Sequence, residues 1–207
     1  MQNILKSNRV CAILRNVPSA ILSDYALAVY ESGIRMFEVA LNSADAFVQI
    51  TLLKQLLPKD ALVGAGTAIT PLLVQRALDA GAAFMLTPSS TAPVLAFCRD
   101  NAVPLLPGVM TPSDVDLCLQ YGFNYLKLFP AADLARGYIK SLQGPFDDTH
   151  YVAVGGVDAG NIRSFFEQGF IGVGIGSSLV PKPFIDKGDW QGARAHIARM
   201  MQSIADV

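Results

Sequence analysis

Short apolar runs alternate with amphipathic segments along the whole chain. The runs are rich in Val, Ile, Leu and Phe, and they begin at Val10, Met36, Ala61, Phe84, Pro104, Tyr125, Tyr151 and Gly172. Successive runs start 20 to 26 residues apart, a spacing that fits one strand followed by one helix. The runs are continuously apolar rather than alternating, which is typical of parallel strands covered on both faces. The pattern therefore predicts eight βα units.

The amphipathic segments carry signals for helix ends. SDYALAVYES, TPLLVQRALDA and TPSDVDLCLQY each begin with Ser or Thr, which can cap a helix, and a Gly follows each of them. QNILKSN predicts a short leading helix, and DWQGARAHIARMMQSIADV predicts the last one. We expect an α/β fold in one domain over residues 1–207, a (β/α)₈ TIM barrel with a short N-terminal helix. A doubly wound open sheet is the alternative.

Composition and charge exclude several classes of protein. Hydrophobic residues make up 52% of the chain and charged residues 16%, a balance that requires a large core and excludes intrinsic disorder. Sixteen basic and 17 acidic side chains give a net charge of -1, which argues against a nucleic-acid partner. No apolar stretch approaches the ~18 residues of a membrane helix, and the first residues do not resemble a secretory signal. We therefore expect a cytoplasmic protein without a membrane partner.

The cysteines and histidines suggest neither a disulfide framework nor a metal site. Cys11, Cys98 and Cys118 are widely spaced and odd in number, so we expect reduced thiols in the core. His150 and His196 are the only histidines and lie far apart in the sequence, which leaves no clustered ligand set. Chemistry that needs neither a metal nor a cofactor is favoured.

Few polar residues stand late in the apolar runs, where a barrel of this kind places its chemistry. They are Arg15, Glu38, Asn42, Thr67, Thr87 and Lys127. Lys127 is the only lysine with strand residues on both sides. Burial should lower the pKa of its ammonium group and leave a nucleophilic amine that can condense with a ketone. The alternative is a lysine that is paired with a buried carboxylate or reaches solvent.

Glu38 is a second charged residue inside an apolar run. Alternation along the strand places Glu38, Ala40 and Asn42 on one face, which we expect to be the barrel interior. A Schiff-base reaction needs a proton shuttle, and a buried carboxylate beside the amine supplies one. The alternative is an ion pair between Glu38 and either Lys127 or Arg15. The two interpretations differ in whether the site has room for a ligand.

Glycines end the last two runs. Gly155 and Gly156 after the seventh run, and Gly176 and Ser177 after the eighth, offer free backbone N–H groups at the position where such barrels often bind phosphate. Neither a P-loop nor a dinucleotide-binding motif is present, so a phosphate monoester is the expected anion. A Gly pair taken alone is more often a tight turn.

Taken together, these residues resemble the KDPG/KHG aldolase family. The stretches that carry the resemblance lie in order between Val10 and Val180 and read AILR (12–15), FEVALNS (37–43), GAGT (64–67), PG (107–108), KLFPA (127–131) and GGV (155–157). The family consists of class I lyases that cleave 2-keto-3-deoxy-6-phosphosugar acids into pyruvate and glyceraldehyde 3-phosphate. The resemblance thus implies a small phosphorylated keto acid as substrate, no cofactor, and a homotrimer.

The resemblance also implies roles for single residues. Lys127 would form the Schiff base and Glu38 would be the general acid/base. Arg15 would hold the keto-acid carboxylate, and Phe129 would pack against the imine. The remaining roles are a pyruvate pocket formed by Thr67, Thr87 and Pro88, and a phosphate site formed by Gly155, Gly156, Gly176 and Ser177.

Two positions differ from the gluconate-type pattern and resemble the branch that acts on 2-dehydro-3-deoxy-6-phosphogalactonate (KDPGal). These are Asn42 in Leu41-Asn42-Ser43, and Val154 directly before the glycine pair. Valine in place of threonine removes a hydroxyl, which should penalise the epimer that needs that hydrogen bond. The alternatives are a KDPG/4-hydroxy-2-oxoglutarate aldolase of the same family, and a barrel that binds phosphosugars without catalysis.

Overall fold

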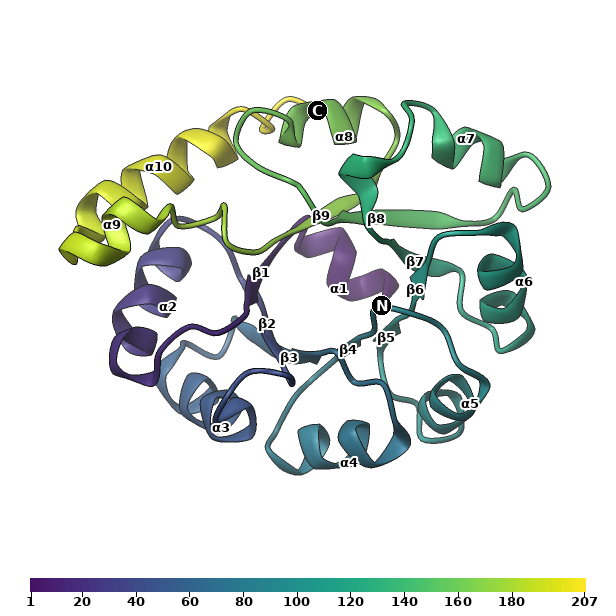
Figure 1. Cartoon of the computed structure of the whole chain (residues 1–207), viewed down its shortest axis with the longest axis horizontal. Helices are drawn as coiled ribbons and strands as arrows, with labels where there is room; N and C mark the ends of the chain where they lie inside the picture. The colour runs from purple at the N-terminus through teal and green to yellow at the C-terminus, as the bar shows by residue number, and fades with distance from the viewer.

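The computed structural model describes residues 1–207 and shows a ring of parallel strands surrounded by helices (Figure 1). The N-terminal half contains α1 (Gln2–Ser7), β1 (Val10–Leu14), η1 (Ser19–Ile21), α2 (Leu22–Glu31), β2 (Met36–Ala40), α3 (Ala46–Leu56), β3 (Leu62–Gly66), α4 (Pro71–Asp79), β4 (Met85–Leu86) and α5 (Ala92–Asp100). The C-terminal half contains β5 (Leu105–Leu106), β6 (Gly108–Val109), α6 (Pro112–Gln120), β7 (Tyr125–Leu128), η2 (Ala131–Asp133), α7 (Tyr138–Gln143), β8 (His150–Val154), α8 (Ile162–Glu167), β9 (Gly172–Ile175), α9 (Lys182–Lys187) and α10 (Trp190–Gln202).

The predicted TIM barrel is confirmed, with one difference in the strand count. The sheet order is β5-β4-β3-β2-β1-β9-β8-β7-β6, and every pairing is parallel. The fifth predicted strand is divided into β5 and β6 at Pro107, which has no N–H to donate to a ladder. Because β5 pairs with β4 and β6 pairs with β7, this divided strand closes the ring. The open doubly wound alternative is wrong.

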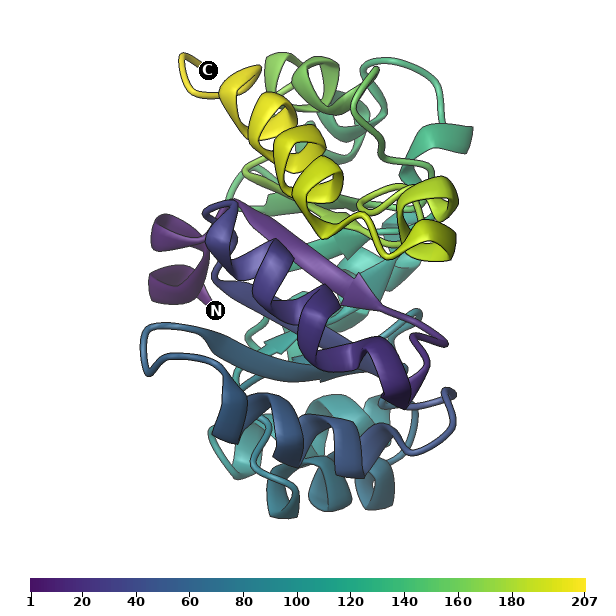
Figure 2. The same cartoon turned by 90° about the vertical axis from the view of Figure 1, so that its left-hand side faces the viewer.

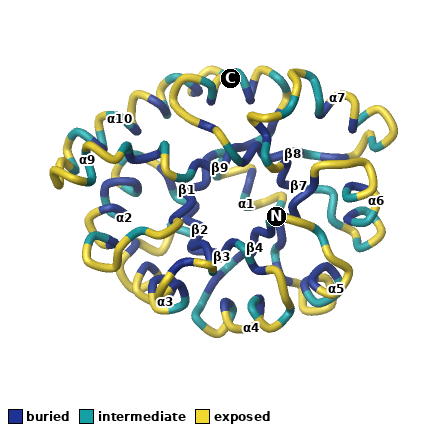
Figure 3. The backbone as a smooth tube through the Cα atoms, in the orientation of Figure 1, coloured by how far each residue is buried: buried dark blue, intermediate teal, exposed yellow.

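Alternating side chains of the strands form two apolar layers. The outer layer lies between strands and helices and includes Phe37, Val39 and Leu126. The inner layer fills the barrel and includes Ile13, Met36 and Val152, among others. Figure 3 shows the buried backbone concentrated in the ring of strands, with exposed segments on the outer turns. A polar side chain in the inner layer therefore lies in a largely apolar environment.

The two ends of the barrel differ. Helix α1 lies at the end where the strands begin (Figure 2), and its Leu5 is buried against the inner layer. Helix α10 packs along α2 on the outside. The opposite end, where the strands finish, carries the loops that follow each strand. No helix of the chain is both long and apolar enough to cross a membrane.

The predicted helix ends are confirmed at two of three N-termini. Thr70 accepts a hydrogen bond from the Leu73 N–H, and Thr111 forms a capping box with Asp114. The predicted Ser23 cap is wrong, because α2 begins at Leu22 directly after η1 and has no side-chain cap. All three of these helices are followed by a glycine with positive φ, as the sequence predicts.

Candidate active site

Lys127 and Glu38 face each other across the barrel interior. Lys127 lies on β7 between Gly108 of β6 and Val152 of β8, while Glu38 lies on β2 between neighbouring strands β1 and β3. Lys127 is 3% exposed and Glu38 is 0% exposed. Each residue belongs to the inward-facing row of its strand, so the expectation that Glu38 points into the interior is confirmed. Sequence alternation places both charges in one apolar chamber.

Burial changes the pKa of both groups. It lowers the pKa of the Lys127 ammonium group, an effect that the nearby Glu38 carboxylate opposes and that Arg15 reinforces. Burial also raises the pKa of the Glu38 carboxyl group, and the positive charges of Lys127 and Arg15 oppose that rise. A lowered pKa increases the fraction of Lys127 present as the nucleophilic free amine, and a raised pKa increases the fraction of Glu38 that is protonated and can act as a general acid.

The pair is not a structural ion pair. Glu38 forms a salt bridge with neither Lys127 nor Arg15. Both carboxylate oxygens of Glu38 are buried without a hydrogen-bond partner. A buried polar group that lacks a partner is costly and rare outside functional sites. The ion-pair alternative for Glu38 is therefore wrong in this structure, and neither charged group is bonded to another protein group.

A cavity of about 460 Å³ opens at the end of the barrel where β1, β8 and β9 finish. Its wall includes Arg15, Phe129, Val154, Gly155, Gly156, Gly176 and Ser177, which are all residues that the sequence analysis singled out. The Phe129 ring belongs to the segment directly after β7, and its centroid lies 5.3 Å from the Lys127 Nζ. Phe129 thus lies between the cavity wall and the Lys127 amine, whereas Lys127 and Glu38 are not themselves part of that wall. The volume is in the range of small-molecule sites.

The loop after β8 has a backbone that requires glycine. Gly155 and Gly156 have φ values of +94° and +73°, and a Cβ on Gly156 would lie 2.5 Å from the Ala132 Cβ. The side chain of Asn161 donates a hydrogen bond to the Gly156 carbonyl at 2.7 Å. The Ser178 hydroxyl donates to the Val157 carbonyl at 2.6 Å. These bonds fix the loop at the edge of the cavity.

The predicted pyruvate-pocket residues lie on the other side of the ring. Thr87 is buried, and its hydroxyl accepts a hydrogen bond from the Gly108 N–H at 3.1 Å. A Cβ on Gly108 would lie 2.4 Å from the Pro88 carbonyl carbon, so these strand ends pack backbone against backbone. Thr67 is half-buried and has a φ of +60°, which is rare for a β-branched residue. Asn42 is exposed at the rim and does not line the cavity.

The cysteines are buried and unpaired, which confirms that they are core thiols. Cys11 belongs to the inner layer, and burial raises the pKa of its thiol. Nowhere in the chain do three or more His, Cys, Asp or Glu side chains come together in a way that could hold a metal ion.

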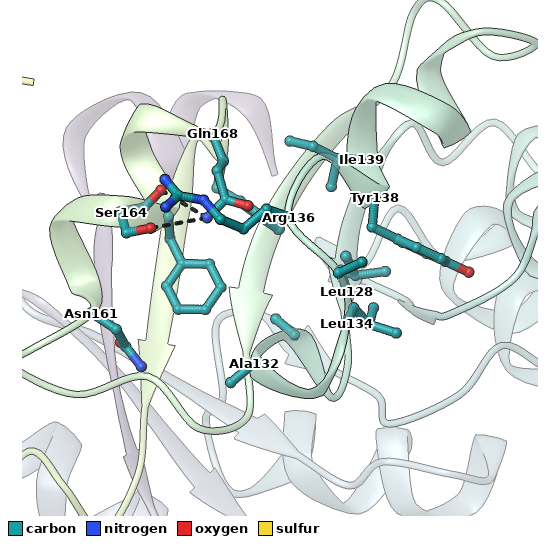
Figure 4. Close-up of a pocket in the computed structure, with 13 residues that line it drawn as sticks. Leu128, Ala132, Leu134, Arg136, Tyr138, Ile139, Asn161, Ser164 and Gln168 are labelled. Carbon is teal, nitrogen blue, oxygen red and sulfur yellow. Dashed lines mark hydrogen bonds between the residues drawn. The ribbon is translucent and has the colours of Figure 1, made fainter.

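A second cavity of about 160 Å³ lies outside the barrel, between the segment containing η2 and α7 and the helix α8 (Figure 4). Its wall is mostly apolar and includes Leu128 and Ile139, with Asn161 and Arg136 at its edge. None of the site residues that the sequence predicts lies in this cavity. Its Asn161 nevertheless binds the loop of the larger cavity, as described above.

Comparison with known proteins identifies the family. The model of the KDPG and KHG aldolase family matches residues 1–196. The chain belongs to this family. A 2-dehydro-3-deoxy-phosphogluconate aldolase of Pseudomonas aeruginosa is 31% identical over 192 residues, which cover 92% of this chain and 86% of the relative. A probable 2-dehydro-3-deoxy-6-phosphogalactonate aldolase of Rhizobium meliloti is 32% identical over 179 residues, which cover 86% of this chain and 85% of the relative.

A solved aldolase of the same family has a matching fold. The KDPG aldolase of Legionella pneumophila, with pyruvate captured as a covalent carbinolamine intermediate, superposes with a TM-score of 0.84 at 27% identity. The match covers 98% of this chain and 95% of that one. The chain is therefore a class I aldolase of the KDPG/KHG type, and relatives named for both epimeric substrates are similar to it.

Sequence analysis selected residues that interrupt the apolar runs, so it missed supporting residues of the site that do not interrupt a run. It assigned no role to Asn161, whose position after a glycine-rich loop is its only local signal, or to Gly66, which is one glycine among several in a strand. Ser178 was expected to contribute to the phosphate loop, but its side-chain bond to Val157 was not foreseen. The contact of Asn161 depends on the conformation of the glycine loop, and those of Ser178 and Gly66 depend on how distant segments meet.

Proposed function

We propose that the chain cleaves 2-dehydro-3-deoxy-6-phosphogalactonate to pyruvate and D-glyceraldehyde 3-phosphate through a Schiff base on Lys127. The observation that carries the proposal is the buried, unpaired Lys127 and Glu38 beneath a cavity lined by Arg15 and glycine N–H groups. A lysine with a lowered pKa has more of the free amine that can attack a ketone, and a carboxyl group with a raised pKa stays protonated to higher pH than an ordinary carboxyl group.

The proposed reaction has two halves. Lys127 Nζ attacks C2 of the keto acid, and Glu38 protonates the departing hydroxyl, which leaves as water and yields a protonated imine. The C4 hydroxyl then gives its proton to Glu38, directly or through a water molecule, while the C3–C4 electrons move into the imine and the aldehyde leaves. The resulting enamine takes a proton at C3, and hydrolysis releases pyruvate and the free Lys127 amine.

The remaining site residues orient the substrate in this proposal. Arg15 binds the carboxylate, and Thr67, Thr87 and Pro88 border the pyruvate carbons. Phe129 forms an apolar wall against the imine, which its position over Lys127 supports. The phosphate is received by the backbone N–H groups of the two glycine loops, namely those of Gly155, Gly156, Gly176 and Ser177.

Preference for the galactonate epimer is assigned to Val154 and Asn42. Val154 is 4% exposed and lines the cavity directly before the glycine loop, so its methyl groups offer no hydrogen bond to a substrate hydroxyl. A substrate whose hydroxyl lies against Val154 and needs a hydrogen bond there would lose binding free energy, because the hydroxyl would be buried without a partner. Asn42 lies at the rim, and its contribution in this proposal is to the outer part of the substrate.

Two alternatives keep the fold and change the function. A KDPG/4-hydroxy-2-oxoglutarate aldolase is favoured by the similarity to the Pseudomonas aeruginosa relative, which is named for the gluconate substrate. A barrel that binds phosphosugars without catalysis would use the same cavity but would form no imine. Borohydride reduction in the presence of pyruvate separates these two, because only an aldolase is trapped at Lys127.

The decisive test is the rate of pyruvate release from the galactonate and gluconate epimers, measured side by side with and without a chelator. We expect a higher kcat/KM for the galactonate epimer and the same rate with chelator. Lys127→Met should abolish release and trapping, whereas the matched variant Lys187→Met, on an exposed helix, should retain both. A preference for the gluconate epimer would contradict the substrate assignment, and turnover by Lys127→Met would contradict the mechanism.

We also propose that the aldolase is a cytoplasmic homotrimer. Val48, Leu52 and Leu56 recur every four residues on α3 and are 58%, 45% and 36% exposed, and Leu72 of the neighbouring α4 is 69% exposed. Apolar residues gathered on one face are typical of an interface between subunits. Leu52→Glu should release monomers in sedimentation analysis, whereas Gln120→Glu, at an exposed position of α6 on the other side of the barrel, should leave trimers. A monomeric wild-type protein would contradict the proposed trimer. The proposed cytoplasmic location is supported by the three free thiols, which fit a reducing compartment.

A further inference from the structure

The carboxyl group of Glu38 occupies the space in which a side chain at position 66 would lie. A Cβ built on Gly66 would be 1.5 Å from Glu38 Oε1 and 2.2 Å from its Cδ. The strand register pairs Gly66 with Ala40 and pairs Glu38 with Gly64. The Glu38 side chain therefore extends along the barrel axis, toward the end where the site opens, and lies over Gly66.

The backbone does not require glycine at this position. Gly66 is the last residue of β3 and is not among the residues with positive φ. Any amino acid can adopt such a strand conformation, and most side chains would stabilise the strand relative to glycine. Position 66 therefore requires glycine because space is lacking for a side chain. The three atoms nearest to a Cβ at this position all belong to the Glu38 side chain.

No polar contact holds that carboxyl group in place. Both oxygens lack a hydrogen-bond partner, and no cation forms a salt bridge with them. The orientation of the group is then determined by the shape of its surroundings. We propose that Gly66 is a positioning residue, whose missing side chain creates the slot that directs the Glu38 carboxyl group toward the substrate. This inference rests on the proposed role of Glu38 as general acid/base.

Gly66→Ala should displace the carboxyl group without removing it. A misplacement of about 1 Å in a reacting group can lower the rate about 100-fold. We therefore expect kcat to fall by about that factor, while KM changes little because the phosphate and carboxylate contacts lie elsewhere. The limb of the pH–rate profile that belongs to the carboxyl group should also move, because its distance from Lys127 changes.

The matched control is Gly144→Ala. Gly144 ends α7 in a helical conformation, and a Cβ there would meet the carbonyl oxygens of Ser141 and Lys140 at 3.5 and 3.9 Å, which are ordinary van der Waals contacts. It should retain the wild-type kcat and pH profile. If Gly66 serves only the fold, Gly66→Ala should have a lower melting temperature, but the kcat of the folded enzyme and its pH profile should be unchanged. That result would overturn the proposal.

A double-mutant cycle makes the steric argument specific. Asp at position 38 is one methylene shorter and should not reach the volume of a Cβ at position 66. Gly66→Ala should therefore cost much less in the Glu38→Asp background than in the wild type, and additive effects would contradict the proposal. If Gly66→Ala fails to fold while Gly66→Ala/Glu38→Asp folds, the clash is supported. If neither folds, the strand itself needs glycine and the proposal is wrong.

The wild-type measurement separates this inference from the proposed function. If the wild type releases no pyruvate from either epimer, the proposed function fails by itself. The position of Gly66 can still be tested in that case, because NMR titration of the Glu38 carboxyl group should give different pKa values in the wild type and in Gly66→Ala. An active wild type with equal kcat in Gly66→Ala overturns the positioning role alone.

Discussion

The Asn161 side chain donates a hydrogen bond of 2.7 Å to the Gly156 carbonyl, and its oxygen accepts one of 2.9 Å from the Asp158 N–H. This one residue at the start of α8 therefore holds both ends of the turn that follows β8. Asn161 lines the cavity outside the barrel (Figure 4), and its partner Gly156 lines the larger cavity at the barrel mouth. These bonds hold a loop with two consecutive positive φ values in one conformation, which the proposed phosphate site requires.

Asn161→Ala should weaken binding of the phosphorylated substrate. Loss of a hydrogen bond of this kind costs about 0.5–1.5 kcal/mol, so KM should rise by up to about tenfold. Trapping of unphosphorylated pyruvate at Lys127 should be unaffected, because pyruvate does not reach the loop. Gln168→Ala is the control, since Gln168 lines the same small cavity but bonds only to Ser164. Equal losses for pyruvate and phosphorylated substrate would argue against a phosphate loop.

The raised pKa of Glu38 predicts how stability depends on pH. The folded protein holds the Glu38 proton more tightly than the unfolded chain does, so its contribution to stability falls as pH rises above the ordinary carboxyl pKa. Lys127→Met removes the larger of the two opposing charges, and Arg15 is present in both variants that are compared. The double variant Lys127→Met/Glu38→Gln should become increasingly more stable than Lys127→Met as pH rises above about 4.3.

Denaturant unfolding from pH 4 to pH 8 measures the difference between these two variants. Each whole unit by which the carboxyl pKa is raised corresponds to about 1.4 kcal/mol at high pH. The difference should be small at the acidic end, where both unfolded and folded Glu38 are protonated. A difference that stays constant with pH would show that Glu38 has an ordinary pKa in the folded protein.

We expect the backbone conformation of Thr67 to lower the stability of the fold and its hydroxyl to contribute to activity. Its φ of +60° is unfavourable for a β-branched residue by about 1–2 kcal/mol, and its hydroxyl forms no hydrogen bond within the protein. Thr67→Asn should raise the unfolding free energy, because Asn tolerates this conformation, and should lower kcat/KM. Thr67→Val keeps the strain and removes the hydroxyl, so it should lower kcat/KM without stabilising the protein. Unchanged kcat/KM in both variants would exclude Thr67 from the substrate site.

Val154→Thr should change the choice between epimers. The added hydroxyl would lie in the wall of the main cavity, where it can bind a substrate hydroxyl that valine leaves unpaired. We expect the ratio of kcat/KM values to move toward the gluconate epimer by about tenfold, the effect of one hydrogen bond. The ratio is insensitive to the fraction of folded enzyme, so it serves as its own control. An unchanged ratio would place the preference in other residues.

The local sequence pattern was sufficient to predict the strands and several helix ends of the barrel. The eight apolar runs, the caps at Thr70 and Thr111 and the three closing glycines are local features, and the structure confirms them. The sequence did not predict the division of one strand at Pro107 or the missing cap of α2. Each of these features depends on which neighbouring segment the residues contact. The side-chain bond from Asn161 to Gly156 depends on the conformation of the glycine loop, and the bond from Ser178 to Val157 joins loops that are distant in sequence.

The sequence by itself determined that Lys127 and Glu38 lie within buried strands of a barrel, because the continuously apolar runs around them must be covered on both faces. It also determined that glycines gather at the ends of the last two strands. Only the tertiary structure decided that the two charged groups remain unpaired and that Gly66 yields its space to a carboxyl group. Distances between side chains on strands that are not neighbours depend on barrel closure, and closure is a property of the whole ring.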